Sequence, residues 1–134
     1  MHNTLLGCIM KNSISWVGGT NIEGKNEAGL LSNIGWKVSA PTPMELVLQS
    51  AGACSLIDVV VGLKEREIRC ADVELIAERA ESSPRIFTKI HMHYIVDADA
   101  PDGLVERIIA KSQEKYCSVS LMLKGKVDIT WSLN

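Results

Sequence analysis

The chain has 134 residues, 46% of them hydrophobic, which is enough for one compact domain with its own core. Its 14 Lys and Arg residues nearly balance 16 Asp and Glu residues, for a formal net charge of −2. Nucleic acids and anionic membranes attract basic surfaces, so this balance argues against both as partners. No secretory leader is evident. We therefore expect a single cytoplasmic domain over residues 1–134.

The first 40 residues alternate short apolar runs with Gly, Asn, Ser and Thr. Apolar runs between such turn-forming residues are typical of β-strands joined by tight reversals. The pattern predicts a β-meander with strands at 5–10, 13–17 and 30–38. Its turns are expected at 18–19, 21 and 24–26.

A long helix is predicted to follow, over residues 43–67. Thr42 is a suitable N-cap, and Glu45 stands three residues later, as in a capping box. The segment is apolar on most of its surface up to Lys64, so we expect it to be central and buried. Charged residues within it argue against a membrane-spanning helix. Residues 50–55 are all small, which predicts that a second helix crosses there.

The rest of the chain predicts a hairpin, a second helix and a final strand. Alternating apolar residues indicate strands at 73–80 and 86–96, joined by a turn at 82–84. An amphipathic helix is expected over 103–116, a short apolar turn over 119–123 and a strand over 126–133. Strands, helix, hairpin, helix and strand in this order make an α+β fold.

The chain has four cysteines, Cys8, Cys54, Cys70 and Cys117, and no CxxC motif, so a zinc ribbon or a thioredoxin site is not indicated. Cys54 lies in the small-residue patch and Cys117 ends the second predicted helix. If that helix packs at the patch, the two sulfurs approach each other. A disulfide between them requires Cα atoms within about 7 Å.

Two segments resemble one known family. Residues 43–46 (PMEL), running into 51–54 (AGAC) and followed by 58–60 (DVV), resemble the first-cysteine helix of the OsmC/Ohr superfamily. That superfamily comprises osmotically inducible protein C and the organic hydroperoxide resistance proteins. Residues 116–119 (YCSV) resemble its second-cysteine motif. The order of predicted elements agrees over nearly the whole chain.

The resemblance implies a thiol peroxidase with no bound cofactor or metal. Cys54 would attack an organic hydroperoxide and become a sulfenic acid, and Cys117 would condense with it to a disulfide that an external dithiol reduces. A nearby second thiol stops oxidation before the irreversible sulfinic step. The resemblance also implies an intertwined homodimer with sites at the subunit interface. Glu45 matches the family glutamate that orients an N-terminal arginine.

Two departures from the family concern that arginine and glutamate. No arginine precedes Arg66, and Glu45 is one residue closer to Cys54 than in the family peroxidases. Lys37, Lys115 and the later arginines remain alternative cations for the thiolate. Nine residues of helix place Glu45 and Cys54 on opposite faces, so a shared site requires Glu45 of the partner subunit or a local bulge.

Other chemistry-bearing residues have simpler interpretations. Asp58 lies on the helix face of the first thiol, where a hydrogen-bonded acid or a dimer contact is expected. Cys8 and Cys70 are expected to be structural. His91 and His93 point to the same side of one strand, but no third ligand follows, so an exposed strand face is favoured over a metal site.

Three functional hypotheses follow. The first is thiol-dependent reduction of organic hydroperoxides in oxidative-stress defence, through Cys54 and Cys117. The second is a non-enzymatic protein of the same fold that binds a small apolar ligand or senses oxidants, which the missing arginine favours. The third is a structural or partner-binding domain, in which no Cys54–Cys117 disulfide forms.

Overall fold

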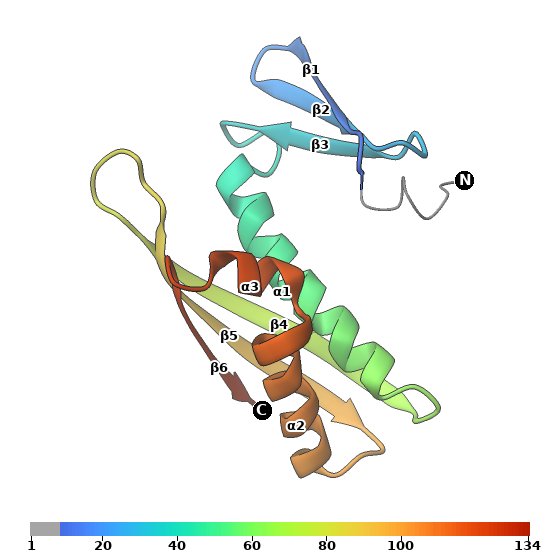
Figure 1. Cartoon of the computed structure of the whole chain (residues 1–134). Helices are drawn as coiled ribbons and strands as arrows, with labels where there is room; N and C mark the ends of the chain where they lie inside the picture. The colour runs from blue at the N-terminus through green and yellow to red at the C-terminus, as the bar shows by residue number, and fades with distance from the viewer. Residues whose placement is uncertain (1–8) are drawn as a thin grey trace. The chain divides into compact units, whose positions relative to one another are not determined.

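A computed structural model describes residues 9–134, which fold as α+β with two sheets and three α-helices (Figure 1). The chain divides into two compact units, one ending at Leu46 and the other spanning Val47–Asn134. The α+β class predicted from the sequence is confirmed.

The first unit holds a three-stranded antiparallel sheet, as the meander predicts. Its strands pair in chain order and are β1 (Ser13–Gly18), β2 (Asn21–Lys25) and β3 (Leu31–Gly35). The turns predicted at 21 and 24–25 are wrong, because Gly18 and Gly19, with φ of 109° and 56°, complete the reversal before β2 begins. Of the strand predicted at 5–10, residues 5–8 lie outside the described residues, and 9–10 are not in a strand.

Helix α1 (Pro43–Gly62) begins where the capping box predicts. The Thr42 backbone N–H donates to Glu45 Oε1 at 3.0 Å, and the Glu45 N–H donates to Thr42 Oγ1 at 3.2 Å. The helix ends five residues before the predicted residue 67. The chain turns away through Glu65, whose φ of 71° is incompatible with a continuing α-helix.

The prediction that most of the α1 surface is buried is wrong for the single chain. One face is buried, and it is formed by Ala51, Gly52, Ser55 and Val59. On the other side, the apolar residues Ile57 and Val61 are 61% and 59% exposed. By length and mean hydropathy alone, 20 residues and 1.6, α1 is able to cross a membrane, a criterion that core helices of soluble proteins also meet.

The second unit holds a sheet in the order β4-β5-β6. The predicted hairpin is present as β4 (Ile68–Arg79) and β5 (Phe87–Ala98), with both strands longer than expected. The last strand, β6 (Asp128–Leu133), pairs parallel to β5. Parallel neighbours require a crossover connection, so the chain between β5 and β6 must leave the sheet and return.

Three helical segments form that crossover, namely α2 (Asp102–Lys111), a π-helical turn η2 (Ser112–Tyr116) and α3 (Ser118–Leu123). The α-helix predicted to residue 116 is therefore correct only to Lys111. The apolar turn predicted at 119–123 is wrong, since these residues form α3, whose first N–H groups are capped by the residue before it.

Close approaches of α1 to its neighbours build the core of this unit. A Cβ on Gly52 would lie 2.7 Å from Leu75 Cδ1 of β4, and one on Gly62 would lie 3.0 Å from Ile108 of α2. The small-residue patch thus faces the sheet at Gly52, and the end of α1 faces the crossover at Gly62. The largest fully buried apolar side chains are Tyr94, Leu63, Ile90, Met92, Ile109 and Val59.

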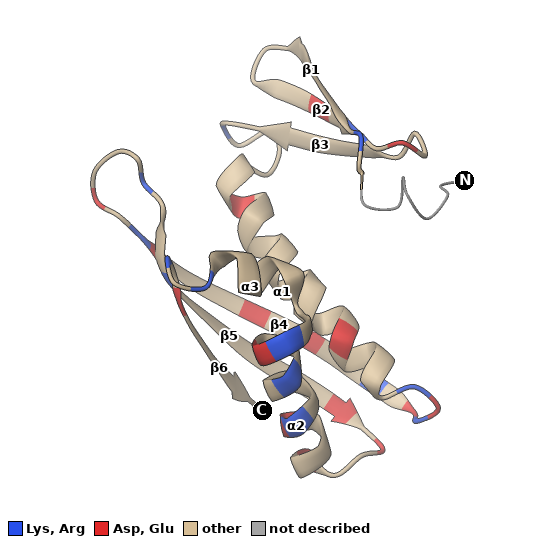
Figure 2. Ribbon diagram, in the orientation of Figure 1, with Lys and Arg blue, Asp and Glu red and all other residues tan. Residues whose placement is uncertain are grey.

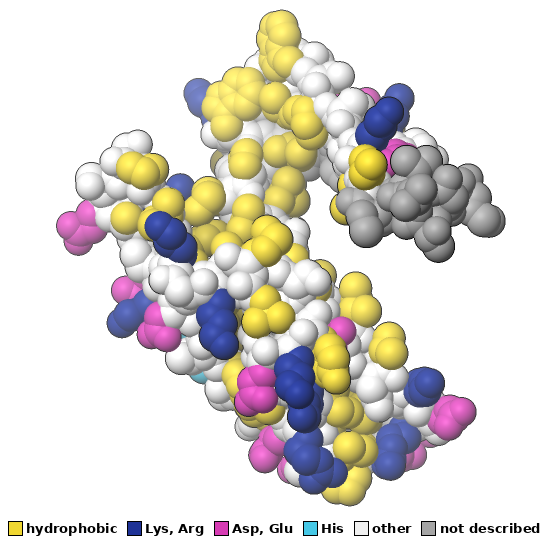
Figure 3. Space-filling view, in the orientation of Figure 1, with side chains coloured by type: hydrophobic (Ala, Val, Ile, Leu, Met, Phe, Trp, Pro, Cys, Tyr) yellow, Lys and Arg dark blue, Asp and Glu magenta, His cyan; other side chains and the backbone are white. Residues whose placement is uncertain are grey.

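Charged residues of both signs occur along the hairpin and α2 of the second unit (Figure 2). Hydrophobic side chains gather on the first unit in the space-filling view (Figure 3). There Trp16 and Leu31 are 68% and 57% exposed.

Candidate functional site

The two candidate thiols lie on different elements of the second unit. Cys54 is in the middle of α1 and is half-buried, whereas Cys117 lies between η2 and α3 and is fully buried. Cys54 lies near enough to Cys117 to raise the pKa of the Cys117 thiol, so the fold brings the two thiols together. Cys54, Cys70 and Cys117 are free thiols. Cys8 lies outside the described residues.

Cys117 is held from both sides. Its Sγ lies 3.2 Å from Ser120 Oγ and 3.8 Å from the carbonyl oxygen of Ala51, one turn before Cys54 on α1. The Ser120 backbone N–H donates to the same sulfur at 3.4 Å, which makes Cys117 the N-cap of α3. These contacts fix the second thiol against the turn of α1 that carries the first.

Burial controls the protonation of Cys117. It raises the pKa of the Cys117 thiol above the ordinary 9.0, and the neighbouring Cys54 adds to the rise. The two hydrogen bonds from Ser120 act in the opposite direction, but burial is the larger effect. Cys117 is therefore a neutral thiol at neutral pH, which suits a group that reacts second rather than first.

A buried hydrogen-bond network joins α1, β5 and η2 beside the thiols. Ser55 Oγ binds the Tyr94 hydroxyl and lies 2.9 Å from Ser112 Oγ. Ser112 donates to Asp58 Oδ2 at 2.8 Å, and Gln113 Nε2 donates to the Tyr94 hydroxyl at 2.9 Å and to Ser55 Oγ at 3.2 Å. Every buried side-chain nitrogen and oxygen of the described residues has a partner, so the network is fully satisfied.

Glu45 lies in the first unit and acts there as a helix cap. Its exposed carboxylate accepts from the Thr42 N–H, and this backbone hydrogen bond lowers the pKa of Glu45. Within residues 9–134, the carboxylate makes no hydrogen bond to any other residue. Its position as the residue that opens α1 is thus accounted for by the capping box alone.

No lysine or arginine of the described second unit is hydrogen-bonded to either thiol. Two of the later arginines have other partners. Arg69 pairs with Asp97 and Asp99 at 2.9 Å each, and Arg66 donates to the carbonyl of Asp99 at 3.0 Å. The cation that the resemblance requires beside Cys54 is not supplied by these two side chains.

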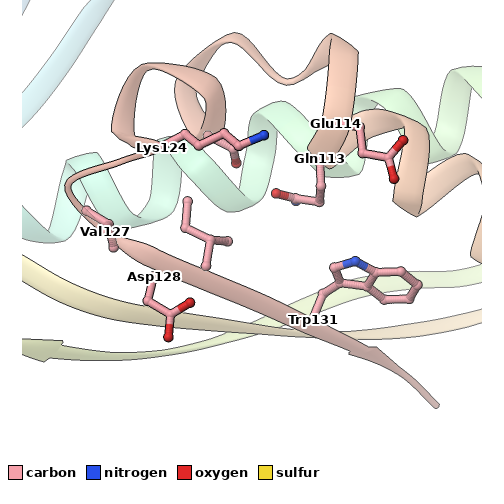
Figure 4. Close-up of a pocket in the computed structure, with 8 residues that line it drawn as sticks. Gln113, Glu114, Lys124, Val127, Asp128 and Trp131 are labelled. Carbon is pink, nitrogen blue, oxygen red and sulfur yellow. The ribbon is translucent and has the colours of Figure 1, made fainter.

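A cavity of about 310 Å³ lies between the helical crossover and β6 (Figure 4). Polar and apolar side chains both line it, including Gln113, Glu114, Lys124, Val127, Asp128 and Trp131. Ser120 also lines this cavity, and its hydroxyl contacts Cys117 Sγ. The cavity therefore ends one side chain away from the second thiol.

The two strand histidines share one face of the sheet, as their spacing predicts. His91 bonds Thr130 Oγ1 at 2.7 Å and Ser132 Oγ at 2.9 Å, and His93 bonds the same Ser132 Oγ at 2.7 Å. The part of the chain that the structure describes contains no cluster of three or more His, Cys, Asp or Glu residues able to hold a metal. Both histidines thus have polar partners on β6.

The sequence did not single out four residues of the network, namely Ser55, Tyr94, Ser112 and Gln113. Only Asp58 was expected to be hydrogen-bonded, as it is. A usable signal was present, because Ser55 and Ser112 are polar at positions whose helical spacing points into the core. Buried hydroxyls require partners, so each implied another polar group nearby.

Comparisons with known proteins place the chain in a family. The family model for OsmC-like proteins matches residues 37–132. Protein YhfA of Escherichia coli K12 is 43% identical over 130 residues, which cover 92% of this chain and 96% of YhfA.

Solved structures share the fold over nearly the full length. A hypothetical protein from Aquifex aeolicus VF5 superposes with a TM-score of 0.80 at 27% identity, over 94% of this chain and 96% of that one. An organic hydroperoxide resistance protein OsmC from Legionella pneumophila superposes with a TM-score of 0.68 at 17% identity, over 93% and 96%. This chain therefore belongs to the OsmC-like protein family.

Proposed function

We propose that this protein reduces organic hydroperoxides with Cys54 as the attacking thiol and Cys117 as the resolving thiol. The observation that carries the proposal is the pairing of a half-buried thiol on α1 with a fully buried thiol beside it. The Legionella protein of the same fold is described as an organic hydroperoxide resistance protein, which supports the substrate class.

The proposed reaction has three balanced steps. The Cys54 thiolate attacks the hydroperoxide and breaks the O–O bond, so that Cys54 becomes a sulfenic acid and the leaving alkoxide takes a proton from water to depart as the alcohol. The Cys117 thiol then attacks the Cys54 sulfur, forms the disulfide and releases water. An external dithiol finally reduces this disulfide to two thiols and becomes a disulfide itself.

The accessibility of the two thiols fits this order. Only the exposed part of the pair meets a substrate from solution, and Cys54 is the more exposed of the two. The raised pKa of Cys117 keeps this thiol protonated until the sulfenic acid forms, and its position near Cys54 then gives it a high effective concentration.

A homodimer belongs to the proposal. Apolar side chains of α1, among them Ile57 and Val61, are exposed in the single chain and would be covered by a second subunit. The partner subunit's Glu45 and a lysine or arginine near it would then complete the thiolate site. Sedimentation of the purified protein tests this element, and a strictly monomeric protein that retains full activity contradicts it.

Turnover with cumene hydroperoxide and dihydrolipoamide tests the reaction. We expect Cys54→Ser to abolish turnover. Cys117→Ser should reduce one equivalent of hydroperoxide and leave Cys54 as a sulfenic acid, which a second equivalent then over-oxidises to the sulfinic acid. Cys70→Ser is the matched control, because Cys70 is a third thiol on β4 and should turn over like the parent. Hydroperoxide reduction by Cys54→Ser at the parental rate would refute the proposal.

A second candidate function is the binding of a small apolar ligand. A cavity of about 420 Å³ in the first unit is lined by apolar side chains, including Ile14, Ile22, Ile34 and Trp36. Negligible turnover together with saturable binding of an apolar fluorophore would favour this candidate. Mass spectrometry of the oxidised protein separates both from a purely structural role, in which no Cys54–Cys117 disulfide forms.

A further inference from the structure

We propose that Ser112 is a positioning residue that sets which side chain of the crossover faces Cys54. Its backbone and its hydroxyl together hold the π-helical turn that directs Cys117, rather than Tyr116, toward α1. The inference deepens the proposed function and rests on it for its catalytic meaning, but its structural content is testable without any peroxide.

The backbone of Ser112 defines the turn. Its carbonyl oxygen accepts from the Cys117 N–H at 2.7 Å, which is the i to i+5 bond of a π-helix. In a regular α-helix the same carbonyl would accept from Tyr116. The inward position one turn after Ser112 therefore passes from residue 116 to residue 117.

Side-chain exposure agrees with this shift. Tyr116 is 63% exposed, whereas Cys117 is 0% exposed. Tyrosine has the larger apolar surface and would gain more from burial, so apolar burial alone does not favour the observed arrangement. Another interaction must hold the turn in its π form, because a regular helix has the better hydrogen-bond geometry.

The hydroxyl of Ser112 supplies that interaction. It donates to Asp58 Oδ2 at 2.8 Å and lies 2.9 Å from Ser55 Oγ. These two partners stand one and four residues after Cys54 on α1, so the hydroxyl is fastened to the same part of the helix that carries the first thiol. Ser112 itself is 0% exposed, and water does not replace these bonds.

The two halves of Ser112 thus link the thiols. The Ser112 hydroxyl binds the part of α1 that carries Cys54, and the Ser112 carbonyl accepts a hydrogen bond from the Cys117 N–H. A change at the hydroxyl should loosen the π-helical turn, let Tyr116 compete for the inward position and turn Cys117 away.

Alkylation of Cys117 by iodoacetamide in a Cys54→Ser background tests the placement directly. Ser112→Ala is expected to raise the alkylation rate by about tenfold or more, because the loss of a hydrogen bond to a carboxylate oxygen shifts an equilibrium by about that factor. Ser118→Ala, an exposed hydroxyl next to Cys117, is the matched control and should leave the rate unchanged. Equal rates in the two variants would overturn the inference.

The partner of the hydroxyl provides a second, independent pair of variants. Asp58→Asn keeps an oxygen acceptor for Ser112 and should alkylate like the parent, whereas Asp58→Ala should alkylate like Ser112→Ala. Asp58 is only half-buried, so both Asp58 variants are expected to fold. They therefore test the role of the Ser112 hydroxyl even if Ser112→Ala does not fold. Similar rates in Asp58→Asn and Asp58→Ala would contradict the role of the hydroxyl.

A thiol–disulfide equilibrium with glutathione separates positioning from peroxidase activity. With both thiols present, Ser112→Ala should lower the effective concentration of Cys117 toward Cys54 by about ten- to a hundredfold. The rate at which the Cys54 thiol itself is alkylated should remain that of the parent. If the parent forms the disulfide but turns over no hydroperoxide, the proposed function fails and the positioning stands. If the parent turns over and Ser112→Ala matches Ser118→Ala in this equilibrium, the positioning fails alone.

Discussion

Tyr94→Phe removes one hydroxyl from the centre of the buried network. The phenol oxygen binds Ser55 Oγ and accepts from Gln113 Nε2, and the side chain is 0% exposed. Neither partner is stranded by the change, because Ser55 keeps Ser112 and Gln113 still donates to Met92 Sδ at 3.4 Å. The full penalty for an unsatisfied buried group therefore does not apply.

The hydrogen bonds of the Tyr94 hydroxyl with Ser55 and Gln113, each of about 0.5–1.5 kcal/mol, are lost together with its weaker contact to Met92 Sδ at 3.6 Å. We therefore expect Tyr94→Phe to lower the free energy of unfolding by about 1–3 kcal/mol. Urea denaturation measures this change in the free energy of unfolding. The protein concentration is kept fixed, because subunit association would make stability depend on concentration. The matched control is Tyr116→Phe, the same change at a side chain that is 63% exposed. Equal stability of the two variants would refute the claim that the network stabilises the fold.

The pKa of Tyr94 adds a test of the same group. Burial raises this pKa above 10.0, and the nearby Cys117 and Asp58 also raise it, although the hydrogen bonds from Ser55 and Gln113 lower it. A raised pKa means that the phenol stabilises the fold below pH 10 and that this contribution is lost as the pH rises through the folded-state pKa. Tyr94→Phe should therefore weaken the alkaline decline in stability.

Three further outcomes are expected. Thr42→Ala removes the capping hydroxyl of α1 and should lower the free energy of unfolding by about 1 kcal/mol in urea denaturation; an unchanged midpoint would show that the cap is not needed. In Cys54→Ser, the alkylation rate of Cys117 should still be rising with pH at 9.0, because burial raises the pKa of this thiol, and a plateau below pH 8 would contradict that environment. Arg69 lowers the pKa of Asp97 below 3.8, so the stabilisation is present above that pH and is lost as the pH falls through the folded-state pKa. Arg69→Gln should thus lower Tm at pH 6, and its Tm should converge with that of the parent in strong acid; the same gap at both pH values would disprove the linkage.

Local signals predicted the start of α1 and the hairpin well. The capping pair Thr42 and Glu45 and the proline at position 43 are short-range features, and they act in the structure as they do in isolated helices. The end of α1 was misplaced because it depends on Glu65, a residue with no sequence signal for a positive φ.

The proximity of Cys54 and Cys117 was predictable from the sequence, but the π-helical turn that positions Cys117 was not. Small residues around Cys54 predicted a close crossing, and Cys117 does contact the carbonyl of Ala51. The π-helical turn left no trace in the apolar periodicity, because Val105, Ile109 and Ser112 fit a regular helix. Only the position of Cys117 against α1 reveals the extra residue.

That extra residue changes how the crossover tolerates alterations in length. Removing a residue from an ordinary helix rotates everything after it by about 100°. Between Ser112 and Cys117, however, the chain carries one residue more than an α-helical turn needs. Deletion of the exposed Glu114 or Lys115 would leave an α-helical turn with the thiol still on its inward face. Related chains that are one residue shorter here can therefore keep the same cysteine geometry, so gaps at this point of an alignment need not separate functional groups.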